Sequence, residues 1–459
     1  MDRKARTRKF QDDDRRYLWH PFTQQRDWVK TDPLIIERGD GVYLEDTEGR
    51  RYLDGVSSIW VNLHGHRKQA LDRALAAQLK RIAHTTLLGA SNIPAIKLAK
   101  RLVALAPAGL TRVFYSDNGS TAVEVALKMA FQYWQLHGGA FRSKNKFVHL
   151  GEAYHGDTLG AVSVGGISVF HDRFKPLLFP TYEAHVPYCY RCPLNLTFPE
   201  CRLSCAGAIE QILRQHNKEI AALIVEPMLL AAGGIITMPP GYLTRIRELC
   251  SDYHVLLIAD EVATGFGRTG RMFACEHEKI KPDFMAVSKG LTGGYLPLAA
   301  TLTTERIYRS FLGRYEEFKT FFHGHSYTGN PLGCAVALAN LEVFRKERTL
   351  QRLKPKVVAL HRLVQPLWDH PHVGDIRQLG FIVGIELVRD RGTKEPYPLA
   401  SRMGMRVADE ARRRGLLIRP LGNVIVLMPP LSTTMRELKQ IVGIVAKAIQ
   451  AVTSASIPS

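Results

Sequence analysis

Two residues of this chain have side chains that can do chemistry together. Asp260 ends an apolar run that begins at Val255, and Lys289 closely follows a second run at 284–287. Such runs are typical of buried parallel strands, whose carboxyl ends meet at one edge of a sheet and hold ligands there. A lysine and an acid at that edge suit pyridoxal phosphate, because the lysine can form a Schiff base while the acid keeps the pyridine nitrogen protonated. The alternative is a buried ion pair without a catalytic role.

A segment that could bind a phosphate lies at residues 116–121 (SDNGST), before an expected helix from Ala122. Gly119 permits close approach of the backbone, and the hydroxyl of Ser120 can bond to the helix end. The free N–H groups and the helix dipole favour a dianion. An ordinary helix N-cap would look the same, but the combination with the Asp–Lys pair favours a phosphate site.

Arg419 lies in an apolar stretch directly before Pro420. An arginine in such a setting usually has a carboxylate partner, which its planar fork binds through two hydrogen bonds. The sequence leaves open whether that carboxylate belongs to the protein or to a substrate. Two His-Gly-His triplets, at 64–66 and 323–325, could offer metal ligands. Since no third ligand is near either triplet, turns or substrate contacts are favoured there.

Two nucleotide-binding patterns are present but incomplete. The glycines at 265, 267 and 270 match the spacing of a dinucleotide-binding turn, yet four residues separate them from the strand and no helix start follows. The run that ends at Glu261 resembles a Walker B strand, but the chain has no Walker A loop. A turn is therefore favoured at 265–270, and nicotinamide or ATP chemistry is disfavoured.

The elements that must position these residues alternate between strands and helices. Apolar runs predict strands at 113–115, 147–150, 222–225, 255–259, 284–287 and 298–302. This alternation is typical of a mostly parallel sheet wrapped by helices. The segment 122–134 predicts a helix that is apolar on most faces and therefore buried. We expect an α/β protein whose large, cofactor-binding domain covers residues 66–333.

The character of the chain changes after residue 333. A helical stretch at 334–344 leads into charged helices and into expected strands such as 381–387 and 424–427. Residues 334–459 are therefore expected to form a smaller α+β domain. Residues 1–65 have their own turn-and-strand pattern at 41–46 and are expected to join that domain.

The composition restricts the class of protein. The 459 residues are 46% hydrophobic and 23% charged, and the longest apolar stretch, 221–238, is interrupted by polar residues and glycines, so no membrane span is expected. The basic N-terminus lacks the apolar core of a signal peptide, so a cytoplasmic location is expected. The net charge is +19, but the positive charge is spread along the chain without a nucleic-acid-binding motif. Binding to nucleic acid is therefore not expected.

Four of the seven cysteines form a cluster, namely Cys189, Cys192, Cys201 and Cys205. Four thiols at short spacings could hold zinc or an iron–sulfur cluster. The gap between the two pairs is shorter than in the usual zinc patterns. A local metal site and four free thiols both stay open, and neither would be catalytic.

Several motifs resemble those of the class III (ω-amino) aminotransferases. The sequence LIADEVATGFGRTG at 257–270, followed by SKG at 288–290, is similar to the signature of that family. Four further segments are similar to its 7,8-diaminopelargonic acid synthase branch, which serves biotin biosynthesis: WHPFTQ at 19–24, SSIW at 57–60, AYHGDT at 153–158 and RPLG at 419–422. The similarity runs through nearly the whole chain.

The resemblance implies a homodimer of PLP-dependent fold type I (aspartate aminotransferase-like), with two sites for pyridoxal 5'-phosphate at the subunit interface. Lys289 would be the Schiff-base lysine, Asp260 would pair with the pyridine nitrogen and Tyr154 would stack on the ring. The implied phosphate-binding residues are Gly119 and Ser120 of one subunit with His325 and Ser326 of the other.

The resemblance also implies the substrates, which are 8-amino-7-oxononanoate and an amino donor. Arg419 would bind the substrate carboxylate, and the pocket would be lined by Phe22, Trp60, Tyr154 and Gly324. Members that use S-adenosylmethionine usually carry tyrosine where Phe22 stands and a second tryptophan where Ile59 stands. Because an aromatic face can stack on a sulfonium or adenine, its loss makes L-lysine an alternative donor.

Two other functions stay open. A different class III ω-aminotransferase, acting on a diamine or a β-amino acid with a 2-oxo acid, would share the same site. A cofactor-binding or scaffold protein of the same fold is disfavoured, because Lys289, Asp260 and the 116–121 segment are all intact.

Overall fold

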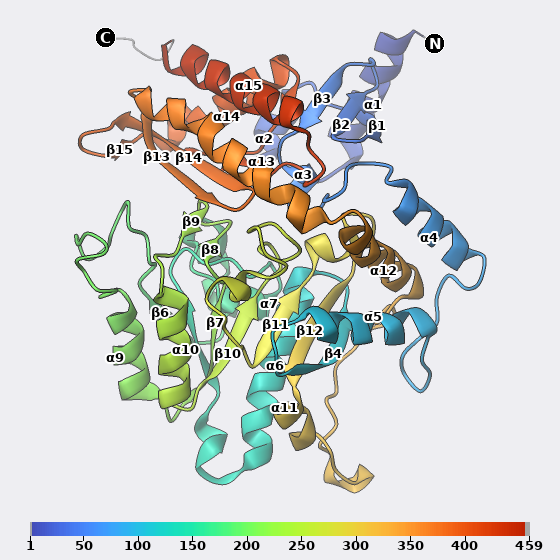
Figure 1. The fold of residues 1–459 in the computed structure, drawn as a ribbon, viewed down its shortest axis with the longest axis vertical. Coiled ribbons are helices and arrows are strands. Elements are labelled where there is room, and N and C mark those ends of the chain that lie inside the picture. The colour runs from blue at the N-terminus through green and yellow to red at the C-terminus, as the bar shows by residue number, and fades with distance from the viewer. Residues whose placement is uncertain (1, 455–459) are drawn as a thin grey trace.

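The computed structural model describes residues 2–454 and is built around a seven-stranded sheet (Figure 1). In spatial order its strands are β4 (Leu110–Ser116), β12 (Ala299–Thr304), β11 (Phe284–Val287), β10 (Leu256–Asp260), β7 (Ile220–Val225), β5 (Lys146–Leu150) and β6 (Tyr182–Ala184). β12 runs antiparallel to both of its neighbours, whereas the pairs from β11 to β6 are parallel. The expected mostly parallel sheet is confirmed.

Helices cover both faces of this sheet, which explains why its central strands are apolar throughout. On β10, Leu257 and Ala259 pack into one core cluster, together with residues of α9 (Ala206–His216) and α10 (Tyr242–Asp252). Their neighbours Leu256 and Ile258 point the other way, into the core beneath α6. Alternate side chains of a strand point to opposite faces, so a strand that is buried on both sides needs apolar residues at every position.

The helix α6 (Gly119–His137) begins three residues before the sequence predicts. Asn118 is its N-cap and accepts a hydrogen bond from the backbone N–H of Thr121 at 3.1 Å, while the Thr121 hydroxyl accepts one from the N–H of Asn118 at 3.1 Å. This reciprocal capping box fixes the start of the helix. Gly119 and Ser120 therefore belong to its first turn, where N–H groups lack partners within the helix.

The N-terminal and C-terminal parts of the chain form a second unit, at the top of Figure 1. Its first sheet has the order β1 (Ile36–Asp40), β2 (Tyr43–Asp46), β3 (Arg51–Asp54) and β16 (Leu416–Leu417). Its second sheet contains β13 (Val373–Leu379), β14 (Ile382–Asp390), β15 (Glu395–Pro396) and β17 (Val424–Leu427). The helices α13 (Thr349–Val364), α14 (Met403–Arg413) and α15 (Met435–Ser454) accompany these sheets. The pairing of β3 with β16 joins the two ends of the chain.

The expected boundary at 333/334 falls inside α12 (Pro331–Lys346), which packs on α4 (Gln69–Leu79) and α5 (Ile93–Leu105). The division into three ranges stays a prediction. The remaining α-helices and strands are α1 (Arg3–Tyr17), α2 (Gln25–Trp28), α3 (Ser57–Trp60), α7 (Leu159–Ser163), α8 (Ser168–His171), α11 (Glu305–Ser310), β8 (Leu229–Leu230) and β9 (Ile236–Thr237). Within residues 2–454, no helix has the length and apolar composition that crossing a membrane would require.

Two segments singled out in the sequence are irregular. Residues 265–270 form consecutive turns after β10, as expected, and no dinucleotide-binding helix follows them. Residues 185–205, which carry the cysteine cluster, contain neither helix nor strand. An irregular segment of that length is uncommon within a compact domain.

Candidate active site

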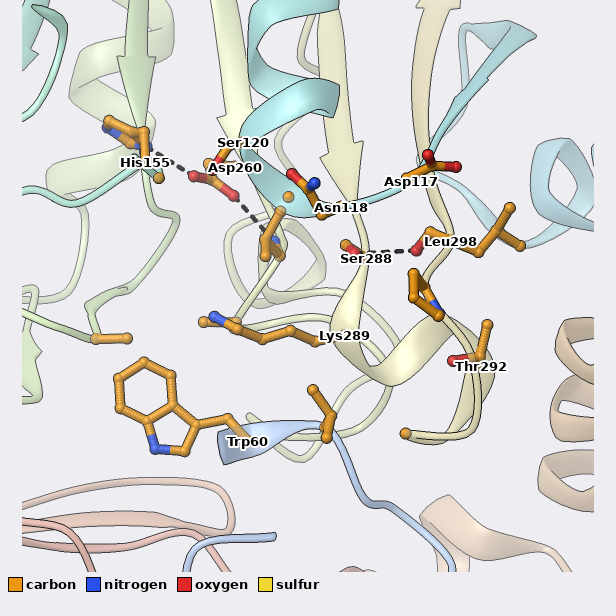
Figure 2. A pocket seen from close by; sticks show the side chains of 18 of the residues that line it. Trp60, Asp117, Asn118, Ser120, His155, Asp260, Ser288, Lys289, Thr292 and Leu298 are labelled. Atoms are coloured by element: carbon orange, nitrogen blue, oxygen red, sulfur yellow. Dashed lines mark hydrogen bonds and ion pairs between the residues drawn. The ribbon is translucent and has the colours of Figure 1, made fainter. Parts of the chain in front are cut away.

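A cavity of about 450 Å³ lies at the carboxyl ends of the central strands (Figure 2). Parallel strands place their carboxyl ends at one edge, which is where α/β proteins bind ligands. Six of the residues predicted from the sequence line it: Trp60, Gly119, Ser120, Tyr154, Asp260 and Lys289. The central prediction, that Asp260 and Lys289 share one site, agrees with this geometry.

Asp260 is the last residue of β10 and is 4% exposed. Its Oδ2 lies 2.7 Å from Nδ1 of His155, and its Oδ1 accepts a hydrogen bond from the N–H of Val262 at 3.0 Å. The other ring nitrogen of His155, Nε2, is buried without a hydrogen-bond partner. The histidine thus fixes the carboxylate at the floor of the cavity, where a buried negative charge can face a ligand cation.

Lys289 follows β11 after one residue, Ser288, and begins a short 3₁₀ helix. Its Nζ lies 4.9 Å from the centroid of the Trp60 ring, which covers it from the side of α3 (Figure 2). Burial lowers the pKa of Lys289 below the ordinary lysine value, although the charges of Asp260 and Glu226 act in the opposite direction. A lowered pKa leaves more of the amine unprotonated at neutral pH, as a nucleophile or base requires.

Glu226 is a site residue that the sequence analysis missed. It follows the last residue of β7, is 3% exposed and lines the same cavity. Burial raises the pKa of Glu226 to about 7. The sequence holds the same signal as at Asp260, an apolar run that ends in an acid, although Glu226 also interrupts the longer apolar stretch 221–238. His155 was missed as well, although it directly follows Tyr154.

The first turn of α6 and the loop 154–157 pack so closely that Gly119 and Gly156 have no space for a side chain. We call this contact the glycine cradle. The Oγ of Ser120 accepts a hydrogen bond from the N–H of Asp157 at 3.0 Å. A Cβ added to Gly156 would lie 1.9 Å from that Oγ, and one added to Gly119 would lie 2.6 Å from Cγ1 of Val262. Glycine at both positions lets the two backbones approach, and the helix N-terminus then offers N–H groups to an anion.

Phe22 and Arg419 do not line this cavity. The rings of Phe22, Phe170 and Tyr154 contact one another in a row that reaches the cavity, here called the aromatic path, and Arg419 lies at its outer end. The guanidinium carbon of Arg419 lies 5.9 Å from the Phe22 ring centroid. The Phe22 ring is 5.2 Å from Phe170, and Phe170 is 6.1 Å from Tyr154. Among residues 2–454, no carboxylate forms an ion pair with Arg419. Of the two alternatives that the sequence leaves open, a carboxylate of the protein and one of a substrate, this geometry favours the second.

Gly324, His325 and Ser326 line a different hollow, a groove of about 1080 Å³. His325 Nδ1 is 3.4 Å from Oδ2 of Asp117, and Asp117 lines the first cavity. In a single chain these residues therefore lie beside the candidate active site but not in it. Their proposed roles in a partner's site stay predictions.

The histidine triplets and the cysteine cluster show no metal site. His64 Nε2 is 2.9 Å from Oδ1 of Asn340, and His66 Nε2 is 3.2 Å from Oδ2 of Asp54, so both rings have protein partners. All seven cysteines are free thiols. Within residues 2–454, no three His, Cys, Asp or Glu side chains are arranged to hold a metal ion. The structure therefore lends the metal hypothesis no support.

Comparison with known proteins decides the family. Residues 25–449 match the model of the family described as aminotransferase class-III. The chain belongs to the class III aminotransferases. It is therefore a transaminase, and the expected PLP-dependent fold type I is confirmed, because solved structures of class III members superpose on nearly its whole length.

Three relatives illustrate the similarity. The adenosylmethionine-8-amino-7-oxononanoate aminotransferase of Geobacter sulfurreducens is 54% identical over 97% of this chain and 98% of that protein. The crystal structure of the enzyme with the same name from Methanocaldococcus jannaschii has a TM-score of 0.92 at 46% identity and covers 97% of this chain and 99% of that one. The ω-transaminase of Pseudomonas jessenii in complex with PMP has a TM-score of 0.92 at 33% identity, covering 97% and 98%.

Proposed function

We propose that this class III aminotransferase converts 8-amino-7-oxononanoate to 7,8-diaminononanoate, a step of biotin biosynthesis. The observation that carries the proposal is the cavity in which the Lys289 amine, the Asp260 carboxylate and the N-terminus of α6 meet. The substrate is supported by relatives of that name at 54% identity over nearly the full length.

We propose pyridoxal 5'-phosphate as the cofactor, since the residues present fit it. The cavity volume of about 450 Å³ lies within the usual range for small-molecule sites. The glycine cradle at the N-terminus of α6 suits a phosphate, and the carboxylate of Asp260 suits a protonated ring nitrogen. The P. jessenii relative is described as a complex with PMP. When bound, the cofactor supplies an electron sink for the carbon that loses a proton.

The chain's own residues then have distinct tasks. Lys289 would hold the cofactor through its amine and, once released, would move a proton at the substrate carbon. The lowered pKa of Lys289 favours both tasks, because each needs the unprotonated amine. Asp260 would keep the ring nitrogen cationic while His155 orients the carboxylate. The rings of Trp60 and Tyr154 would cover the site and exclude water.

The substrate would lie along the aromatic path at the mouth of the cavity. Phe22 and Phe170 present rings to an aliphatic chain, and Arg419 stands at the outer end with no carboxylate partner among the described residues. An arginine binds a carboxylate through two parallel hydrogen bonds. This arrangement favours a substrate whose carboxylate is separated from its reacting carbonyl by a hydrocarbon chain.

For the amino donor we propose S-adenosylmethionine, with L-lysine as the alternative. The names of the relatives support the first. The second is favoured by Phe22 and Ile59, which are 54% and 44% exposed and lack the phenol and indole that members using S-adenosylmethionine usually carry.

We further propose that the protein is a homodimer. The groove that carries Gly324, His325 and Ser326 is lined by apolar side chains, and Leu88 and Phe322 on it are 89% and 72% exposed. A contiguous exposed apolar surface marks a protein–protein interface. The partner's loop could then complete the phosphate site. A cytoplasmic location stays a prediction.

A second candidate function is that of another ω-aminotransferase. A thermostable ω-transaminase variant engineered for the synthesis of bulky amines superposes with a TM-score of 0.93 at 32% identity, so the fold itself is compatible with amine chemistry. Turnover of a diamine or β-amino acid with a 2-oxo acid, without turnover of 8-amino-7-oxononanoate, would favour this function over the first.

Lys289→Ala should abolish turnover of 8-amino-7-oxononanoate with either donor, by at least about a thousandfold, because it removes the amine that serves as nucleophile and base. The assay measures 7,8-diaminononanoate with S-adenosylmethionine and with L-lysine in parallel. Borohydride reduction should bleach the yellow wild-type enzyme and label Lys289. Lys175→Ala, an exposed lysine on the surface, is the matched control. Turnover retained in the Lys289 variant would refute the proposal.

A further inference from the structure

Glu226 connects two walls of the candidate active site. Its Oε1 accepts a hydrogen bond from the N–H of Tyr154 at 3.1 Å, and its Oε2 accepts one from the N–H of Ala231 at 2.9 Å. Both partners line the cavity, but they belong to different loops, one after β5 and one after β8. One carboxylate therefore fixes the distance between two segments that lie 77 residues apart in the sequence.

The backbones of these two loops are packed directly against each other near Glu226. A Cβ added to Gly233 would lie 2.3 Å from the carbonyl oxygen of Glu152. Ala231 in turn belongs to a core cluster against which Trp60 packs. Movement of the Ala231 loop would thus disturb both Tyr154 and Trp60, which line the cavity together with Lys289.

The charged groups around Glu226 come from three elements. His155 follows the strand β5, Asp260 ends β10 and Lys289 begins the 3₁₀ helix after β11, and each interacts electrostatically with Glu226. Burial opposes ionisation of Glu226, and the charge of Asp260 opposes it too, whereas the charge of His155 favours it. Because burial raises the pKa of Glu226 to about 7, its charge changes within the working pH range of an enzyme.

We propose that Glu226 is a positioning residue of the transamination site, which holds Tyr154 and Ala231 in place and adds its negative charge to that of Asp260 in support of a protonated nitrogen where Lys289 would hold the cofactor. The inference rests on the proposed function. It assigns Glu226 two separable tasks. The reach of the side chain sets the geometry of the walls, and its charge sets the protonation of the amine that holds the cofactor.

Two substitutions separate these tasks. Glu226→Gln keeps the length of the side chain but removes the charge, so the pH midpoint of the absorbance change of the bound cofactor should fall by about one unit. Glu226→Asp keeps the charge but is too short to reach both N–H groups. Losing one charge-assisted hydrogen bond should weaken binding of pyridoxal phosphate to the apoenzyme by about tenfold, with the pH midpoint nearly unchanged.

Glu183→Gln is the matched control, because Glu183 is an exposed carboxylate on β6 that does not line the cavity. The Glu183→Gln variant should change neither the pH midpoint of the cofactor absorbance nor the affinity for pyridoxal phosphate. The inference is overturned if the Gln variant keeps the wild-type midpoint, or if the Asp variant binds the cofactor as tightly as the wild type. If the wild-type enzyme itself shows no cofactor absorbance, the proposed function fails instead, so the two failures are distinct.

Discussion

Arg419 shows how a single residue can point to a ligand. Many arginines of the described residues form ion pairs with a carboxylate, as Arg413 does with Glu410, but Arg419 contacts the Phe22 ring instead. A guanidinium on an aromatic face keeps its N–H fork free for a second partner. Since no residue of the described chain pairs with it, a substrate carboxylate is the partner that its position favours.

At this residue, Arg419→Ala should raise the KM for 8-amino-7-oxononanoate by about 10- to 100-fold, because a charge-assisted hydrogen-bond pair is lost. The KM of Arg419→Lys should lie between the values of the wild type and of Arg419→Ala, since lysine keeps the charge but not the planar fork. The KM for a primary amine that lacks a carboxylate should be unchanged in both variants. Steady-state kinetics with both substrates check this.

The control for that experiment is Arg352→Ala, on the exposed side of α13 and outside the cavity lining. Its KM should equal that of the wild type. An equal loss of activity towards the amine without a carboxylate would show that Arg419 acts on the fold of the site and does not bind the carboxylate.

At the scale of elements, the site depends on loops that pack too closely for any side chain larger than hydrogen. Gly156 has a φ of +121°, a region that other residues rarely adopt, and it touches Ser120 in the first turn of α6. The loop and the helix must therefore stay in contact for the helix N-terminus to face the cavity. A methyl group at this contact would separate them.

Gly156→Ala should therefore lower the affinity of the apoenzyme for pyridoxal phosphate by at least about tenfold and destabilise the fold by about 1–3 kcal/mol. Cofactor titration and chemical unfolding measure the two effects. Gly443→Ala is the matched control, because a Cβ at Gly443 inside α15 meets no atom within 4 Å. That variant should be as stable as the wild type or slightly more stable. Unchanged cofactor affinity in Gly156→Ala would contradict the role of the cradle.

The sequence predicted those elements whose signals are local. The apolar runs before Asp260 and Lys289 predicted two strand ends and a shared site, and the structure places both residues in one cavity. The helix α6 begins three residues earlier than predicted, because its capping box is completed by Thr121, where Glu or Gln is more usual.

Other site features depend on contacts between distant segments, which local patterns do not encode. Glu226 acts through hydrogen bonds to Tyr154 and Ala231, and the apolar run that it ends gave no hint of either partner. The position of Arg419 next to Phe22 joins residues almost 400 apart in the sequence. Such pairs are fixed by tertiary packing within each unit, so the sequence could offer the residue types but not their neighbours.

For the molecule as a whole, the groove beside the candidate active site exposes apolar side chains that a partner would bury. Its rim includes Leu88 and Phe322, which are among the most exposed apolar side chains of the described chain. The loop that carries His325 lies in the same groove and reaches Asp117, at the edge of the cavity. A second copy of the chain on this surface would bury the apolar residues and bring the two active sites close together.

The protein should therefore be a dimer, with a mass in light scattering of twice the 51.5 kDa of the chain. Leu88→Arg would place a charge in the buried interface and should produce monomers with weakened cofactor binding, because an unpaired buried charge is costly and the partner's loop is lost. Leu399→Arg is the control, since Leu399 is 82% exposed on the C-terminal unit and lies outside the groove; it should stay dimeric and active. A monomeric Leu88 variant with full activity would show that one chain completes the site by itself.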